Sequence, residues 1–97
     1  MSDQGSDPAV QAVRERIADV DDELVALINE RLELVRELHA YKRARGYPMV
    51  DPAREARLLD ALVETNPGPL SDVELRALWT ILLALLTREA ARLLDET

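Results

Sequence analysis

The stretch between Pro8 and Gly46 limits the possible folds most, because neither Pro nor Gly interrupts it. Its apolar residues recur at alternating intervals of three and four, which is the spacing of a single stripe along an α-helix. Pro8 suits the first turn, where the amide hydrogen that it lacks would have no partner. We therefore predict one helix of about 37 residues. The stripe consists of Val10, Val13, Ile17, Val20, Leu24, Leu27, Leu34 and Leu38.

The length of this helix bears on assembly. A helix of about 37 residues spans about 55 Å, whereas a compact monomer of this size is only about 30 Å across. The overhanging part has to bury its apolar stripe, most simply against the same helix of a second copy. We therefore predict an intertwined helical homodimer, with a long helical hairpin or a fragment of a larger bundle as the alternative.

Two breaks that combine Pro with Gly separate the long helix from two shorter ones, at Gly46–Pro48 and Asn66–Pro69. Asp51 and the proline after it are typical of a helix start. Ser71 opens a capping box, because a Glu follows three residues later. Apolar residues keep a helical spacing after each start. The sequence thus predicts an all-α fold of three helices in a single domain, with residues 1–7 disordered.

Composition excludes several classes of protein. The net charge of −7 would repel nucleic acid and anionic membrane surfaces. The chain has no cysteine, which rules out disulfides and thiol nucleophiles. Its longest apolar run, Ile81–Leu86, is far shorter than the ~20 residues that span a bilayer. The polar, acidic N-terminus lacks the pattern of a secretory signal. We expect a cytoplasmic protein without a nucleic-acid or membrane partner.

Two cations on the long helix break its pattern. Arg31 stands where the stripe requires an apolar residue, and a buried charge needs an anionic partner. Lys42, the only lysine among twelve basic residues, lies close to three turns further on, about 16 Å along the same face. Together the two could hold a small dianion. The alternative is that Arg31 pairs with a core Glu while Lys42 extends to water.

The start of the second helix is a further candidate. Arg54 and Glu55 fall in its first turn, where backbone amides are free and the dipole is positive, so an anion and a ligand hydroxyl could bind there. Glu55 is equally explained as dipole compensation. Arg14 lies too far from Arg31 to share a site within one chain, but it could do so across a dimer. His39 has no metal-ligand spacing around it and is expected on the surface.

The order of these residues resembles the all-helical (AroQ class) chorismate mutase family over nearly the whole chain. Members of that family are intertwined dimers of three-helix chains. They rearrange chorismate to prephenate, on the way to phenylalanine and tyrosine, without a cofactor, a metal, a nucleophile or a proton transfer. The residues that carry the resemblance are Arg14, Arg31, Lys42, Asp51, Arg54 and Glu55.

The resemblance implies a role for each residue. Arg31 and the partner's Arg14 would hold carboxylates, and Arg54 would support the carboxylate end. Lys42 would contact a carboxylate and donate to the ether oxygen, where charge develops. Glu55 and the backbone of Asp51 would hold the ring hydroxyl.

The third helix departs from the family pattern, which places a Ser there and, four residues later, a Gln or Glu that donates to the ether oxygen. This chain has Leu86 and Ala90 at those positions, or Thr87 and Ala91 in a register shifted by one residue. The second donor is therefore missing, which implies a low intrinsic rate and a partner such as a DAHP synthase. Two alternatives are a mutase or pyruvate lyase acting on 4-amino-4-deoxychorismate or isochorismate, and a non-catalytic helical dimer.

Overall fold

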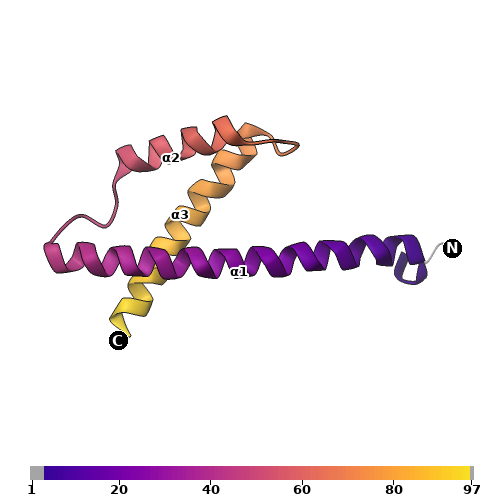
Figure 1. Cartoon of the computed structure of the whole chain (residues 1–97), viewed down its shortest axis with the longest axis horizontal. Coiled ribbons are helices and arrows are strands. Elements are labelled where there is room, and N and C mark those ends of the chain that lie inside the picture. Colours follow the sequence, from indigo (N-terminus) through magenta and orange to yellow (C-terminus); the bar gives the residue numbers. More distant parts are fainter. Residues whose placement is uncertain (1–3, 97) are drawn as a thin grey trace. The chain divides into compact units, whose positions relative to one another are not determined.

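The computed structural model describes residues 4–96 and contains three α-helices in this range, α1 (Pro8–Arg45), α2 (Pro52–Thr65) and α3 (Asp72–Asp95) (Figure 1). A short 3-10 helix, Gln4–Ser6, precedes them, and these residues include no strand. The predicted all-α fold with a long first helix is confirmed. Of the segment expected to be disordered, residues 1–3 lie outside the described part of the chain.

Helix α1 has 38 residues and ends at the glycine that the sequence indicates. Gly46 has a φ of +68°, a conformation that favours glycine. The backbone N–H of Gly46 donates to the carbonyl of Arg43 at 3.3 Å, and that of Tyr47 donates to the carbonyl of Lys42 at 2.9 Å. These two bonds form a Schellman motif, which satisfies the last carbonyls of the helix. The chain therefore turns away directly after the turn that carries Lys42.

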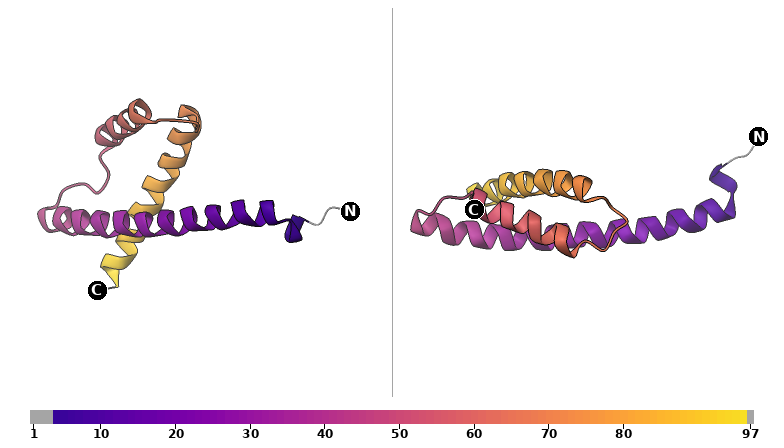
Figure 2. Two further views of the ribbon diagram at one scale, coloured as in Figure 1. Left: turned by 45° about the vertical axis from the view of Figure 1, so that its right-hand side comes forward. Right: turned by 90° about the horizontal axis from the view of Figure 1, so that it is seen from above.

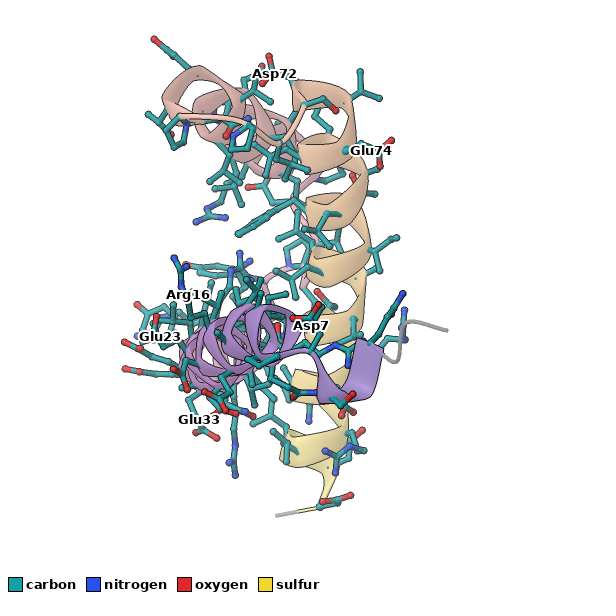
Figure 3. All side chains as sticks on the ribbon, turned by 90° about the vertical axis from the view of Figure 1, so that its right-hand side faces the viewer. Asp7, Arg16, Glu23, Glu33, Asp72 and Glu74 are labelled. Atoms are coloured by element: carbon teal, nitrogen blue, oxygen red, sulfur yellow. The ribbon has the colours of Figure 1, made fainter. Side chains whose placement is uncertain are left out.

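Both shorter helices begin with the caps expected from their sequences. In α2 the Oδ1 of Asp51 accepts a hydrogen bond from the backbone N–H of Arg54 at 3.1 Å. In α3 the Oγ of Ser71 accepts one from the backbone N–H of Glu74 at 3.2 Å, and Glu74 lies in the first turn of α3 (Figure 3). Each bond satisfies an amide that the helix itself leaves without a partner.

The chain divides into two units, Met1–Arg31 and Leu32–Thr97, with the boundary inside α1. In the N-terminal unit the apolar stripe is open to solvent, since Val13, Leu24 and Leu27 are 50 to 60% exposed. Arg16 and Glu23, from the same part of α1, are exposed as well (Figure 3). This unit therefore contains no described segment that buries its stripe. The single domain over the whole chain stays a prediction.

The C-terminal unit contains the buried core of the described residues, which is small: His39 is 5% exposed, Leu86 1% and Ala90 0%. The loop after Thr65 joins α2 to α3, and the two helices diverge from it (Figure 2). The expectation of a surface histidine is wrong, because the rest of this unit covers the flank of α1 that carries His39. A pattern read along one helix does not show what packs against it.

Two ion pairs connect the helices of the C-terminal unit. The Nη2 of Arg76 in α3 lies 2.9 Å from the Oδ1 of Asp60 in α2. The Nη1 of Arg43 in α1 lies 3.0 Å from the Oδ1 of Asp95 in α3. Both pairs are well exposed, so each contributes little to the stability of the fold.

Across residues 4–96, no helix combines the length and the apolar character that crossing a bilayer requires. The same residues contain no group of three or more His, Cys, Asp or Glu side chains arranged to hold a metal ion.

Candidate active site

Lys42 and Asp51 line one pocket of about 370 Å³ in the C-terminal unit. Its walls come from the last turn of α1, the connecting segment and the first turn of α2. The Schellman motif after Arg45 allows this, because it reverses the chain and returns it beside Lys42 within a few residues. Lys42 is half-buried and Asp51 is exposed. An ammonium and a helix N-terminus thus meet at one hollow, which suits a small anion.

Glu55 lines a second pocket, of about 390 Å³, between α2 and α3. Val50 lines both pockets, so the two hollows adjoin each other. Lys42, Asp51 and Glu55 therefore come together around one hollow region of the C-terminal unit. The other residues that line the second pocket are Leu59, Thr80, Leu83, Ala84, Thr87 and Arg88.

The structure places Arg54 differently from what the sequence predicts. Its backbone N–H is already bonded to the carboxylate of Asp51, so this amide is not available to an anion. Its side chain is exposed and does not line either of these pockets.

Leu86 and Ala90 lie in the core and line neither pocket. Thr87, by contrast, lines the pocket of Glu55. Consecutive residues of an α-helix are rotated by about 100°, so Thr87 belongs to the neighbouring face of α3, together with Thr80 and Ala84. Of the two registers considered for the third helix, the one shifted by a residue thus places a hydroxyl in the hollow region. The roles of Leu86 and Ala90 in binding stay predictions.

Arg88 is a residue of the hollow region that sequence reasoning missed. It lines the pocket of Glu55 and adds a cation to it. A weak signal was available, because the small residues Thr80, Ala84 and Thr87 recur at helical spacing beside it and leave room for a ligand.

Arg14 and Arg31 belong to the N-terminal unit. Arg14 is exposed, whereas Arg31 is half-buried and has an interaction partner. Both lie on α1, which continues into the C-terminal unit and there carries Lys42.

The hollow region contains cations, carboxylates and threonine hydroxyls. Among the described residues, no histidine lines either pocket. Thr80 and Thr87 therefore have no histidine beside them in the pocket to act as the base that covalent catalysis by a hydroxyl needs. What the region can do is hold a small anion, orient it and stabilise charge that develops on it.

Comparisons with known proteins identify the family of the chain. A model of the family chorismate mutase type II matches residues 13–90. Form I of the chorismate mutase from Thermus thermophilus is 33% identical, with a TM-score of 0.78 over 80% of this chain and 98% of that chain. Form II is 32% identical, with a TM-score of 0.83 over 87% of this chain and 96% of that one. No curated protein matches. The chain belongs to the chorismate mutase type II family.

Proposed function

We propose that this protein is an isomerase that rearranges chorismate to prephenate in the biosynthesis of phenylalanine and tyrosine. The observation that carries the proposal is the meeting of Lys42, Asp51 and Glu55 around two adjoining pockets of the C-terminal unit. The rearrangement is concerted, so it needs no nucleophile and no proton transfer. It requires a folded conformer of a dianion and a donor at the breaking ether oxygen, which is what cations at a hollow supply.

Each residue has a proposed role. Lys42 contacts a carboxylate and donates to the ether oxygen, which suits its compact ammonium group. Glu55 and the backbone of Asp51 hold the ring hydroxyl. The cap supports this division of labour, because the carboxylate of Asp51 accepts from the N–H of Arg54 and its carbonyl accepts from the N–H of Glu55, which leaves the backbone N–H of Asp51 for the ligand. The side chain of Arg54 supports the carboxylate end.

We also propose that the active form is a homodimer in which each site draws on both chains. The exposed stripe of the N-terminal unit supports this, because Val13, Leu24 and Leu27 would each gain burial against a second copy. A helix of 38 residues is about 57 Å long and exposes its stripe over many turns. The dimer would bring the partner's Arg14 to the site that contains Arg31.

The third helix supports a modest intrinsic rate. Leu86 and Ala90 have no hydrogen-bonding side chain, and both are enclosed in the core. We propose that a partner such as a DAHP synthase raises the rate, and that binding it orders the site. The cytoplasmic location stays a prediction.

The direct test is to incubate the purified chain with chorismate and to identify the product by NMR. Prephenate would support the proposal. A product from 4-amino-4-deoxychorismate but none from chorismate would identify the amino compound as the substrate instead. Glu55 allows this outcome, because a carboxylate can hold an ammonium as well as a hydroxyl. Pyruvate released from isochorismate would indicate a lyase. Binding of a DAHP synthase with no turnover of any of the three substrates would indicate a non-catalytic module.

A further inference from the structure

Arg88 is the cation of α3 that lines the pocket of Glu55. Lys42 lines the adjoining pocket, so each of the two pockets has one cation among its described lining residues. The chain has a net charge of −7 and therefore repels a dianion overall. A dianion that binds here needs local cations, and a ligand with two carboxylates matches one cation in each pocket.

Arg88 has no ion pair within the described part of the chain, unlike the other two arginines of α3. Arg76 is paired with Asp60 at 2.9 Å. Arg92 is paired with Glu89, the neighbour of Arg88, at 2.7 Å. The nearest carboxylate along the helix is therefore already held by another guanidinium. The N–H donors of Arg88 have no acceptor among the described residues and are left for a ligand.

Thr87 adds a second donor to the same wall of the pocket. Its hydroxyl forms no hydrogen bond with another described residue. The hydroxyl of Thr80, which lines the same pocket, instead donates to the carbonyl of Arg76 at 2.8 Å. A carboxylate has two oxygens, so it can accept from the hydroxyl of Thr87 and from the guanidinium of Arg88 together.

Glu55 lines this pocket as well and, by itself, would repel an anion. It forms no ion pair with a described residue, so the pocket contains a carboxylate and a guanidinium that are not joined to each other. A ligand with a hydroxyl for Glu55 and a carboxylate for Arg88 satisfies both groups. The proposed substrate carries both. Apolar or small side chains that suit a carbon ring complete the wall: Leu59, Leu83 and Ala84.

We propose that Arg88 binds one carboxylate of the substrate from the α3 side of the Glu55 pocket, and that the hydroxyl of Thr87 donates to the same carboxylate. This role rests on the proposed chorismate mutase activity. The carboxylate takes no part in the bond changes, so Arg88 binds the ground state and the transition state about equally. Arg88 therefore sets the affinity for a dicarboxylate and leaves the rate of the chemical step unchanged.

The first test compares two variants of the full chain. Arg88→Gln removes the charge and keeps most of the length of the side chain, whereas Arg88→Lys keeps the charge. We expect Arg88→Gln to raise KM for chorismate about 10- to 100-fold with kcat nearly unchanged, because a charge-assisted contact of uniform strength is lost. Arg88→Lys should recover most of the affinity. An unchanged KM in Arg88→Gln, or a loss confined to kcat, would overturn the proposal.

The matched control is Arg57→Gln, which removes the same charge from an exposed arginine of α2 that lines neither pocket. It should leave KM and kcat unchanged, because solvent screens a distant exposed charge. A similar rise in KM for Arg57→Gln and Arg88→Gln would assign the effect to the net charge of the protein and overturn the proposal. Arg88 is exposed, so thermal unfolding should show both variants folded.

The contribution of Thr87 is tested by Thr87→Val, which replaces the hydroxyl by a methyl group of similar size. We expect this variant to raise KM by a smaller factor than Arg88→Gln, about 3- to 10-fold, because one hydrogen bond to the carboxylate is lost. An unchanged KM would contradict the shared carboxylate.

A binding measurement identifies the group that Arg88 recognises and does not depend on turnover. The probes are a bicyclic ether dicarboxylate that mimics the folded conformer of chorismate, and its two monomethyl esters, each of which lacks one negative charge. We expect calorimetry to show that the wild type binds the dicarboxylate more tightly than either ester. In Arg88→Gln this preference should shrink at least about 10-fold for one of the two esters. Equal preferences in the wild type and the variant would overturn the proposal.

Turnover and binding together separate the two proposals. If the wild type binds the dicarboxylate through Arg88 but forms no prephenate, the proposed function fails and the carboxylate site remains. If the wild type forms prephenate and Arg88→Gln equals it in KM and in binding, only the role of Arg88 fails.

Discussion

The guanidinium of Arg43 lies 3.0 Å from the carboxylate of Asp95, and this pair joins the last turn of α1 to the last residue of α3. Arg43 is adjacent to Lys42 and four residues after His39. The pair therefore holds the end of α3 close to the turn of α1 on which the proposed chemistry depends.

Arg43→Ala should lower the free energy of unfolding by only about 0.2 to 1 kcal/mol, because both side chains are well exposed and water screens their attraction. High salt should reduce the difference further. Urea denaturation at low and high ionic strength measures this effect. Arg57→Ala is the control, because Arg57 is exposed and has no ion pair among the described residues. A loss that does not respond to salt would contradict a screened surface pair.

Leu86→Ala should be the most costly core substitution in the C-terminal unit, because Leu86 is the largest fully buried side chain of the described residues. Replacing a buried leucine by alanine typically lowers the free energy of unfolding by about 2 to 5 kcal/mol. Leu85→Ala, one residue earlier and 39% exposed, should cost much less. Urea midpoints at a fixed protein concentration measure both. A similar loss for the two variants would show that Leu86 is not packed as described.

Stability should fall as the pH drops from about 7.5 to 5.5, in part because of His39. The pKa of this group is lowered in the folded chain by burial and by Lys42 and Arg43, so below the ordinary value of 6.5 the unfolded chain binds more protons. The stabilising contribution is therefore complete above pH 6.5 and is lost as the pH falls towards the pKa of the folded state. On α3 the carboxylate of Asp95 is paired with Arg43.

His39→Gln should remove this part of the pH dependence, because glutamine does not titrate. Urea midpoints of the wild type and the variant, at about pH 7.5 and about pH 5.5 and at one protein concentration, give the comparison. Parallel losses of stability in the two proteins would assign the effect to other groups.

Mixing two inactive variants tests whether the sites are shared between chains. If each site takes Arg31 from one chain and Arg14 from the other, Arg14→Ala and Arg31→Ala remove residues that different chains contribute to that site. A mixed dimer then has one intact site, and random mixing of equal amounts restores about a quarter of the wild-type activity. Activity is measured after the two variants are unfolded together and refolded. No recovery by mixed dimers would exclude the shared site.

The three helices were predictable because their signals are local. Gly46 ends α1 through its own backbone conformation, and Asp51 and Ser71 each cap the helix that follows them. Each signal acts over a few residues, so a single sequence is enough to interpret it. Lys42 stood out for a similar reason, because it is the only lysine of the chain.

The parts that sequence missed depend on contacts between helices. Nothing in the pattern of α1 shows that the flank with His39 is covered, because the covering residues come from elsewhere in the chain. The register of α3 was open for the same reason, since a shift of one residue exchanges Leu86 for Thr87. In the structure Leu86 is buried and Thr87 lines the pocket of Glu55, and the roles of Leu86 and Ala90 in binding stay predictions.

The rate of prephenate formation by the wild type and by Lys42→Ala tests the central claim most directly. We expect the wild type to form prephenate and Lys42→Ala to lose about 100- to 1,000-fold in kcat, because an electrostatic donor at the ether oxygen is removed. Thermal unfolding should show both proteins folded, since Lys42 is only half-buried. Lys42→Arg, which keeps the charge but changes its shape, should not restore the rate. Wild-type activity in Lys42→Ala, or a product other than prephenate, would contradict the assignment.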